Sequence, residues 1–331
     1  MNKRGIVFTF IAVILLSILI LMFLIQSNKK TELEITKSSV QTTTLNSFVK
    51  SLKTEYVPRA IEVSSNQAIL ALLDYMERNQ RFLLNSEVDI INSTLTGHDP
   101  EGNELGMMLY YEDGELINYT IHSALDEVKD LAEQTQINFS FDPYNLNISQ
   151  KDSWTLEVII YNFEFTVASL DGKTRWEDTI NISTELSITN YRDPIILLNE
   201  SLNITIEKAD TTTYPSMDGN IDKIVNQTEN HTFNTNPDAP SFLQRLEYDL
   251  TLNPEGYGIE YIVNPIFNDN SAGYILVDHK YWNKDSNGRC SGVVPGTGLP
   301  NFYLDRSHLL NVYGFSPGDI NSWCPLPPPP P

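Results

Sequence analysis

Residues able to perform acid–base, nucleophilic or metal chemistry are present in this chain, but their spacing matches no catalytic motif. The five histidines form neither an HExxH pair nor a local metal cluster. Two Asp–His pairs, at 278–279 and 305–308, would build a metal site only if the fold joined them. There is no GxSxG nucleophile elbow, phosphate-binding glycine-rich loop or dinucleotide fingerprint. We therefore expect no catalytic residue, no metal site and no cofactor, and interpret the protein as not an enzyme.

One stretch near the C-terminus resembles half of a calcium-binding loop. Asn283, Asp285 and Asn287 alternate with other residues before Gly288, as oxygen ligands do in such loops. The twelfth position is Val294, where the loop requires a bidentate Glu. We therefore interpret the stretch as a turn between strands.

Cys290 and Cys324 are the only two thiols of the chain. Their number excludes a disulfide-dense small scaffold and any four-thiolate zinc or iron–sulfur site. Outside the cytoplasm the two are expected to form a disulfide, and a catalytic thiol is the alternative. The bridge would stabilise the C-terminal part by about 3–4 kcal/mol.

Charge and composition exclude further classes of protein. The chain has 331 residues, with 43 Asp and Glu against 22 Lys and Arg and a net charge of −21. Sequence-independent nucleic-acid binding needs a basic surplus, so we expect no nucleic-acid partner. Because 41% of the residues are hydrophobic and 10% aromatic, the bulk of the chain can bury a core.

An uncharged apolar run from Ile6 to Ile25 contains only Thr9 and Ser17 as polar residues. At about 1.5 Å per residue, a helix of this length crosses the hydrocarbon part of a bilayer. The alternative is a cleaved signal peptide, whose apolar region is shorter and ends at a small-x-small site. We predict a retained single-pass anchor whose partner is the lipid bilayer.

Nine Asn-x-Ser/Thr sequons indicate on which side of the membrane the chain lies. The lysines after the span outnumber the basic residues before it, which by itself opposes an outside location. Long domains, however, cross the membrane with little regard to flanking charge, and the sequons favour a glycosylated exterior. We therefore predict an extracytoplasmic bulk with glycans at Asn92, Asn118, Asn138, Asn147, Asn181, Asn199, Asn203, Asn226 and Asn230.

Lys3-Arg4-Gly5 directly before the apolar helix resembles the class III signal of archaeal type IV pilins and archaellins. The resemblance implies cleavage between Gly5 and Ile6, with the mature chain beginning at its anchor. Many type IV pilins have a Glu at the fifth mature position, where this chain has Phe10. The alternative is an uncleaved anchor with two basic flanking residues.

Helical periodicity continues beyond the anchor. Leu45, Phe48, Val49, Leu52 and Tyr56 form one amphipathic stripe. The three threonines at 42–44 favour a break, and the proline at 58 favours an interruption or kink. A second stripe then runs to about position 79, at positions 61, 68, 69, 72, 73 and 76. This pattern predicts a helical stalk.

The following region reads first as a loop and then as a small helix. Residues 85–106 are polar and rich in turn formers, which predicts a loop, and 107–111 resemble a strand. Ser123 is a candidate cap for a short helix whose buried stripe would be Leu125, Val128 and Leu131.

Two long strand-like runs, 154–169 and 174–189, flank Asp171-Gly172, which predicts a two-residue hairpin. The resulting register pairs Trp176 with Val167, and positions 180 and 182 with 163 and 161. The apolar face of the first run switches from odd to even positions, which predicts a β-bulge near 158–160. We expect further strands at 137–141 and 202–206.

From about 137 to 315 the chain resembles a group of uncharacterised archaeal membrane-anchored surface proteins. The matching pieces, in order, are KDSWTLEVIIYNFEF, TELSITNYRDPIILLN, PSFLQRLE, YGIEYIVN, VDHKYW and FYLDRSHLLNVYGF. The resemblance implies an anchored exterior location and pilin-like starts. It carries no catalytic residue or activity that could be transferred.

These observations predict an α+β fold: a transmembrane helix and stalk, an antiparallel sheet packed by helices, and a small C-terminal α+β unit. The predicted segments are an anchor (1–30), a stalk (31–84), the sheet domain (85–208), a polar linker or excursion (209–240), the C-terminal unit (241–324) and a polyproline tail (325–331).

The function we expect is that of a pilin-like surface protein in adhesion, filament or envelope assembly, located at the cell membrane. We expect its protein partners to be further copies of the same chain or other pilin-like subunits. The alternatives are a tethered extracytoplasmic module that binds a ligand or metal, and an exported enzyme.

Overall fold

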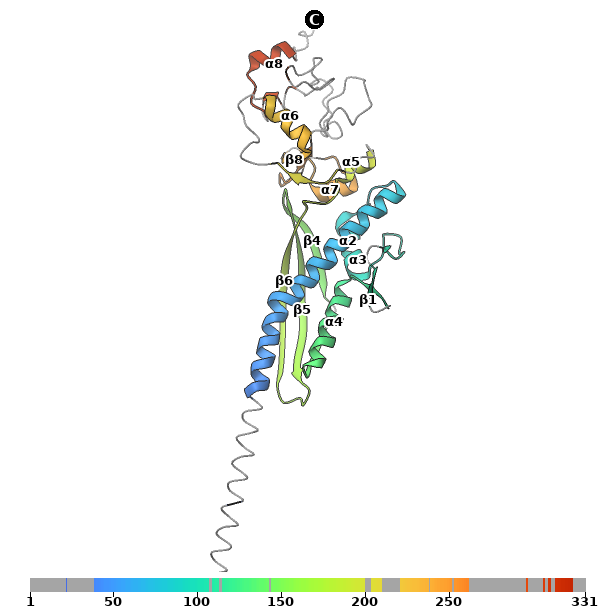
Figure 1. Cartoon of the computed structure of the whole chain (residues 1–331), viewed down its shortest axis with the longest axis vertical. Helices are drawn as coiled ribbons and strands as arrows, with labels where there is room; N and C mark the ends of the chain where they lie inside the picture. The colour runs from blue at the N-terminus through green and yellow to red at the C-terminus, as the bar shows by residue number, and fades with distance from the viewer. Residues whose placement is uncertain are drawn as a thin grey trace, which may run out of the picture. The chain divides into compact units, whose positions relative to one another are not determined.

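The protein is an α+β structure with an antiparallel sheet and covering helices (Figure 1). The computed structural model describes residues 39–106, 109–112, 115–142, 144–199, 204–209, 221–237, 239–251, 253–261 and 313–323, and positions 22, 296, 306, 309 and 310. They form two compact units that interleave along the chain, whereas the sequence pattern divides it into consecutive segments. Unit 1 comprises 1–57, 127–143 and 163–180, and unit 2 comprises 58–126, 144–162 and 181–331.

Unit 1 is a helix packed on the end of a long hairpin. Residues 39–51 are helical and run into the π-helix η1 (Leu52–Tyr56). Strand β3 (Ile137–Phe141) pairs antiparallel with the last residues of β5 (Thr155–Ser169), and β6 (Arg175–Ser187) pairs with β5. The predicted stripe is confirmed at Leu45, Val49 and Leu52, which are buried, but Tyr56 is 40% exposed.

The threonine-rich stretch does not break the helix. The hydroxyls of Thr43 and Thr44 each donate to the backbone carbonyl four residues earlier, at 2.9 and 3.0 Å, so these side chains add hydrogen bonds to the helix. The interruption predicted at Pro58 takes the form of the π-turn just before it, where the Val57 N–H bonds to the Leu52 carbonyl. A wider turn accommodates a residue that has no N–H and whose ring crowds the preceding turn.

Unit 2 contains most of the remaining elements, built around helix α2 (Val57–Asn79), which runs beside the sheet (Figure 1). The predicted stripe is confirmed: all six positions from Ile61 to Met76 are buried, and the helix ends at Asn79 as expected. The other elements of the chain are α3 (Ser86–Thr96), β1 (Leu109–Glu112), β2 (Glu115–Asn118), α4 (Ile121–Gln134, shared by both units), β4 (Asn145–Asp152), α5 (Pro194–Asn199), β7 (Glu207–Lys208), α6 (Ile221–Asn230), β8 (Thr232–Thr235), α7 (Phe242–Glu247), β9 (Ile259–Tyr261) and α8 (Pro317–Trp323).

The hairpin keeps the predicted register but not the predicted turn. The Ser169 N–H donates to the Thr174 carbonyl at 2.9 Å, as that register requires. Residues 170–173 form a longer loop, in which the Gly172 N–H bonds to the Ser169 carbonyl and Gly172 has a φ of +66°. A longer loop therefore replaces the two-residue turn while the same residues stay opposite each other.

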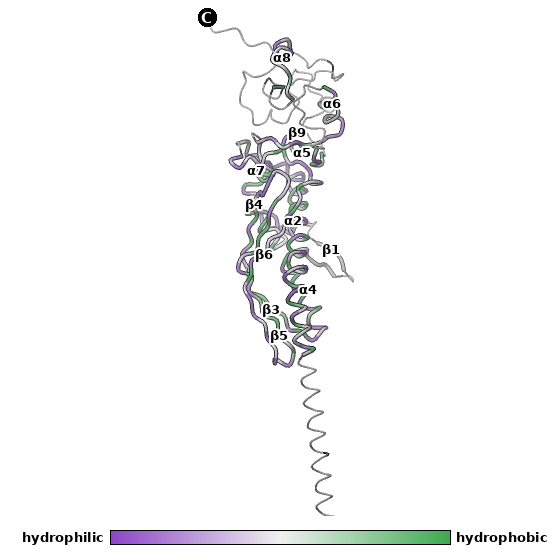
Figure 2. Tube along the Cα trace, turned by 90° about the vertical axis from the view of Figure 1, so that its left-hand side faces the viewer, coloured by the Kyte–Doolittle hydropathy of each residue, from purple (hydrophilic) through white to green (hydrophobic). Residues whose placement is uncertain are grey.

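Strand β5 has the predicted extra residue, but the β-bulge lies at Tyr161–Asn162 and not at 158–160. At the open end of the hairpin, the Ile188 N–H bonds to the Trp154 carbonyl. Strand β5 therefore has one residue more than β6 between this bond and the loop. Tyr161 and Asn162 are both exposed, Asn162 has a φ of +53°, and its N–H donates to the side-chain carbonyl of Asn181 at 2.9 Å. Apolar and polar residues alternate along these strands (Figure 2).

The loop predicted for 85–106 is wrong in its first half, where α3 forms. The Asn85 side chain accepts a hydrogen bond from the Val88 N–H at 3.0 Å, and Gly97 ends the helix with a φ of +74°. Glu87 and Asp89 lie in the first turn, where a negative charge interacts favourably with the positive end of the helix dipole. The turn-forming residues are therefore the two caps of a helix.

Two details predicted for α4 are also wrong. The helix is capped by Thr120, whose hydroxyl accepts from the Ser123 N–H at 3.2 Å, because the helix begins two residues before Ser123. Leu125 is buried as expected, but Leu131 is 58% exposed and Ala132 is buried beside it.

The segment assigned to a C-terminal unit contributes α7 and β9 to unit 2. Helix α7 contacts α3, α5 and β4, and β9 completes the sheet β7-β8-β9, in which β8 pairs antiparallel with β9 and parallel with β7.

Apart from Met22, the predicted membrane span Ile6–Ile25 lies outside the described residues. Within the described ranges, no helix combines the length and the apolar character that crossing a bilayer requires.

Gly258 allows a close backbone approach next to β9. A Cβ at this position would lie 2.0 Å from the Ala239 carbonyl oxygen and 2.4 Å from that of Asn236. Both contacts are with backbone, which cannot rotate away. The Asn236 N–H also donates to the Gly258 carbonyl at 3.0 Å, so the two segments are held together.

We therefore predict that Gly258→Ala lowers the free energy of unfolding by about 3 kcal/mol or more. The matched control is Gly106→Ala, because a Cβ at Gly106 has no atom within 4 Å. Urea unfolding of the two variants beside the parent measures the difference. Equal midpoints for both variants would contradict the close approach.

Candidate functional site

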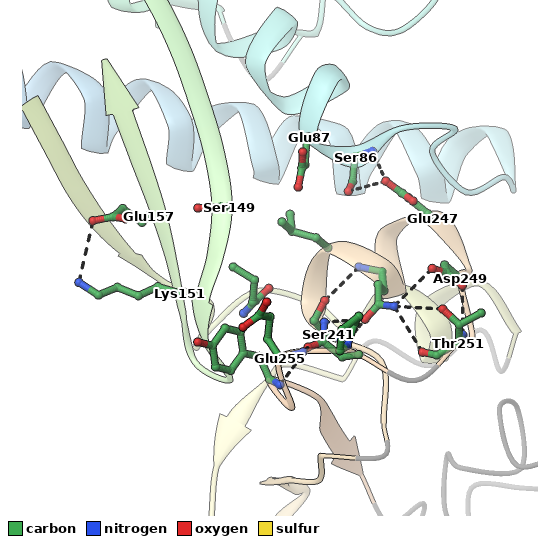
Figure 3. A pocket seen from close by; sticks show the side chains of 16 residues that line it. Ser86, Glu87, Ser149, Lys151, Glu157, Ser241, Glu247, Asp249, Thr251 and Glu255 are labelled. Atoms are coloured by element: carbon green, nitrogen blue, oxygen red, sulfur yellow. Dashed lines mark hydrogen bonds and ion pairs between the residues drawn. The ribbon is translucent and has the colours of Figure 1, made fainter. Parts of the chain in front are cut away.

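A polar pocket of unit 2, with a volume of about 700 Å³, is the candidate functional site. Helices α3 and α7, strands β4 and β5, and loop residues within 249–251 and 253–257 line it (Figure 3). Its charged lining consists of one lysine and five carboxylates, namely Lys151, Glu87, Glu157, Glu247, Asp249 and Glu255. The pocket is therefore strongly acidic.

A capping box at the start of α7 organises one wall. The Gln244 N–H donates to the Ser241 hydroxyl at 3.4 Å, and the Ser241 N–H donates to the Gln244 side-chain oxygen at 3.0 Å. The same Gln244 oxygen accepts from the Asn253 amide at 2.9 Å, and the Asn253 oxygen accepts from the Glu255 and Tyr257 N–H groups. One glutamine thus ties the helix start to the loop.

Glu247 joins α7 to the start of α3. One of its carboxylate oxygens accepts from the Ser86 N–H at 2.6 Å and from the Ser86 hydroxyl at 2.8 Å. The neighbouring backbone is joined as well, because the Leu83 N–H donates to the Leu246 carbonyl at 2.9 Å. A carboxylate at a helix N-terminus satisfies N–H groups that have no partner within the helix.

Carboxylates gathered at this helix start repel one another. Partial desolvation, and then the negative charge of Glu247, raise the pKa of Glu87 above its ordinary value. Desolvation is also the main cause that raises the pKa of Asp89. On the opposite wall a hydrogen bond from Lys151 to Glu185 raises the pKa of the lysine. The negative charge of Glu247 therefore acts on both carboxylates in the first turn of α3.

A fully buried ion pair joins α7 to the start of α5. Arg245 and Asp193 are both 0% exposed, and the arginine Nε donates to an aspartate oxygen at 2.6 Å. The arginine Nη1 donates to the Ile259 carbonyl at 3.2 Å, and the other aspartate oxygen accepts from the Ile196 N–H at 3.0 Å. The pair therefore connects α5, α7 and β9.

The pocket's chemistry is that of a hydrogen-bonding, cation-attracting surface. Ser86 donates to a carboxylate and has no imidazole beside it among the lining residues. In the described part of the chain, no group of three or more His, Cys, Asp and Glu could hold a metal ion. Bound cationic or hydroxyl-bearing groups would fit this lining best.

The structure describes five side chains of the nine predicted glycosylation sites, and all five are exposed. They are Asn92 on α3, Asn138 on β3, Asn147 on β4, Asn181 on β6 and Asn230 on α6. In unit 1, Asn138 alternates with buried Ile137 and Phe139 and so lies on the solvent face of the sheet. In unit 2, Asn147 and Asn181 likewise precede buried Ile148 and Ile182. The side chains of Asn118, Asn199, Asn203 and Asn226 lie outside the described set.

The other residues singled out by the sequence form no shared site among those that the structure describes. Gly5, Ile6, Cys290 and Cys324 lie outside the described residues, as do the two Asp–His pairs and the stretch 283–294. His122 pairs with Asp126 at 3.4 Å within α4, and the His231 ring contacts the Tyr261 hydroxyl at 2.7 Å.

The pocket residues were missed by sequence reasoning, although one local signal marks the start of α7, which lines the pocket, and another marks α5, which contacts α7. Ser241-x-x-Gln244 is a capping-box pattern before an apolar run. Asp193-Pro194 places a capping residue before a proline at the first helical position, which marks the start of α5. Neither signal indicates that these helices meet.

No protein-family model matches this chain, and no curated protein and no solved structure matches it.

We predict that Asp193→Asn lowers the free energy of unfolding by about 3–5 kcal/mol, because it leaves the Arg245 charge buried without its counter-ion. The control is Arg59→Ala, which removes an exposed pair with Glu62 and should change stability by less than about 1 kcal/mol. Chemical denaturation at neutral pH measures both. Similar losses in the two variants would contradict a special role for the buried pair.

The raised pKa of Glu87 predicts a pH dependence of stability. The folded state holds this proton more tightly than the unfolded state, so the charged form is destabilising. The free-energy gain from Glu87→Gln should therefore be absent below pH 4.5 and grow as pH rises through the raised pKa.

Asp178→Asn supplies a comparison of opposite sign. A hydrogen bond from Lys53 lowers the pKa of Asp178, so its stabilisation is present above pH 3.8 and is lost as pH falls through the lowered pKa. The loss caused by Asp178→Asn should therefore shrink in acid. Unfolding curves between about pH 2.5 and 7 measure both profiles, and parallel profiles would contradict the assignment.

Proposed function

We propose that this chain is a membrane-anchored, extracytoplasmic and glycosylated surface protein of pilin-like design, which acts in adhesion, filament or envelope assembly and performs no catalysis. The observation that carries the proposal is the exposure of every sequon asparagine whose side chain is described. A glycan is large and hydrophilic, so its asparagine must reach solvent in the folded protein.

The strand sequons support this proposal in more detail. In an extended strand, residues two apart lie on the same face, so the Ser or Thr of each sequon shares the solvent face with its asparagine. At Asn181 the side-chain oxygen accepts the Asn162 N–H, while attachment would use the side-chain nitrogen. The bulge and a glycan at Asn181 are therefore compatible.

The remaining support comes from the sequence. The uncharged run Ile6–Ile25 has the length of a bilayer span, and the pilin-like start before it motivates cleavage after Gly5. In this proposal the bilayer is the first partner, and other copies or other pilin-like subunits are the second.

A second candidate is a tethered ligand-binding module. The acidic pocket of about 700 Å³ favours it, because a concave surface with convergent polar groups is a common form of binding site.

The proposal predicts glycopeptides at Asn92, Asn138, Asn147, Asn181 and Asn230 in protein isolated from membranes of its native cells. The Ser183→Ala variant should lose the Asn181 glycan alone and leave the Asn181–Asn162 hydrogen bond in place. The matched control is Ser187→Ala, which lies on the same strand outside any sequon. Mass spectrometry of the peptides measures both.

The same preparation tests the anchor and its processing. A mature N-terminus at Ile6 supports pilin-type cleavage, whereas an intact Met1 restricts the proposal to an uncleaved anchor. Five unmodified asparagines, in a chain that protease cuts only after cell lysis, would overturn the proposed location.

A further inference from the structure

Exposed apolar side chains lie next in sequence to residues that line the acidic pocket, on two adjoining stretches of chain. Leu84 is 96% exposed and Val88 47% exposed at the start of α3, and Tyr248 is 40% exposed after α7. The Tyr248 ring stacks on Phe82 with 4.6 Å between centroids. The backbone bond from Leu83 to Leu246 joins the same two stretches. Large apolar side chains gathered on one surface mark contact sites, whereas single ones are ordinary.

Carboxylates interrupt these apolar side chains on both stretches. Glu87 lies between Leu84 and Val88 in the sequence, and Tyr248 lies between Glu247 and Asp249. The three carboxylates line the pocket (Figure 3). Partial desolvation, and then the negative charge of Glu247, raise the pKa of Glu87, so these two carboxylates lie close enough to repel each other.

From this arrangement we infer that the rim formed by Leu84, Glu87, Val88, Glu247 and Tyr248 docks a segment of another protein that carries Lys or Arg among apolar side chains. The stem of a Lys or Arg packs on apolar surface while its charged end pairs with carboxylates, so one such residue suits both halves of the rim.

The charge of the chain argues for another protein over a second copy. Each copy carries a net charge of −21, so two copies repel over this already acidic surface. A basic segment is attracted to it, and the attraction directs the encounter before the apolar contacts form. The inference goes beyond the proposed function, because it does not depend on glycans or on the membrane.

The test uses the full chain in nanodiscs of zwitterionic lipid and a synthetic twelve-residue peptide with Leu and Lys separated by Gly and Ser. Isothermal titration calorimetry, corrected for empty nanodiscs, should show saturable binding to one site. Leu84→Ser should weaken this binding about fivefold or more, because its side chain would be buried on docking. Glu87→Gln should weaken it about twofold to threefold and reduce its salt dependence.

Matched controls exist on α4, where Leu131 is 58% exposed and Glu133 is also exposed. Leu131→Ser and Glu133→Gln should leave the affinity unchanged. All four substituted side chains are exposed, so folding is little affected, and circular dichroism verifies it.

Several results would overturn the inference. Equal affinities in all four variants would show nonspecific attraction to an acidic chain. Equal binding of a peptide with Glu in place of Lys would exclude charge recognition. Self-association that Leu84→Ser abolishes, without any peptide binding, would assign the rim to contacts between copies of this chain.

Discussion

The buried pair of Arg245 and Asp193 is the interaction on which the described part of unit 2 most depends. Burying either charge alone would carry a large desolvation penalty. The attraction between the two charges and their additional hydrogen bonds offset that penalty. The aspartate begins α5, the arginine belongs to α7, and the arginine also holds a carbonyl of β9. The pair therefore holds three elements together, because separating the two buried charges would cost a large free energy.

The pocket follows from this fixed framework. Because the buried pair fixes α7 against α5 and β9, the two ends of α7 can each organise a neighbouring segment. Gln244 holds the loop at Asn253, and Glu247 holds the start of α3. The walls are thus built by neutral and charged hydrogen bonds, while further carboxylates line the cavity. The hydrogen bonds thus hold the walls in place, and the remaining carboxylates make the pocket acidic.

The sheet and its helix show a different use of local irregularity. The π-turn before Pro58 and the bulge at Asn162 each add one residue to a regular element. In both places the extra residue keeps an apolar face continuous, on the helix and on β5 respectively. The outer face of the strands is left polar, and the exposed sequon asparagines of the strands lie there. In the proposed surface protein, this polar face would carry the glycans.

The sequence alone determined those features that depend on neighbouring residues. The stripe on α2, the hairpin register and the extra residue of β5 all appear as periodicity, because each residue's face is fixed by its place in a helix or strand. The sequence also supplied the sequons and the apolar run on which the proposed location depends.

Which segments meet depends on the tertiary structure and cannot be predicted from local patterns. Arg245 and Asp193 are 52 positions apart, and Ser86 and Glu247 are 161 apart. No local pattern encodes such pairs, so α3 looked like a polar loop and its caps looked like turn residues. Packing against β4 and α7 is what makes this short helix stable, since isolated helices of this length are marginal in water. The pocket and its rim exist for the same reason.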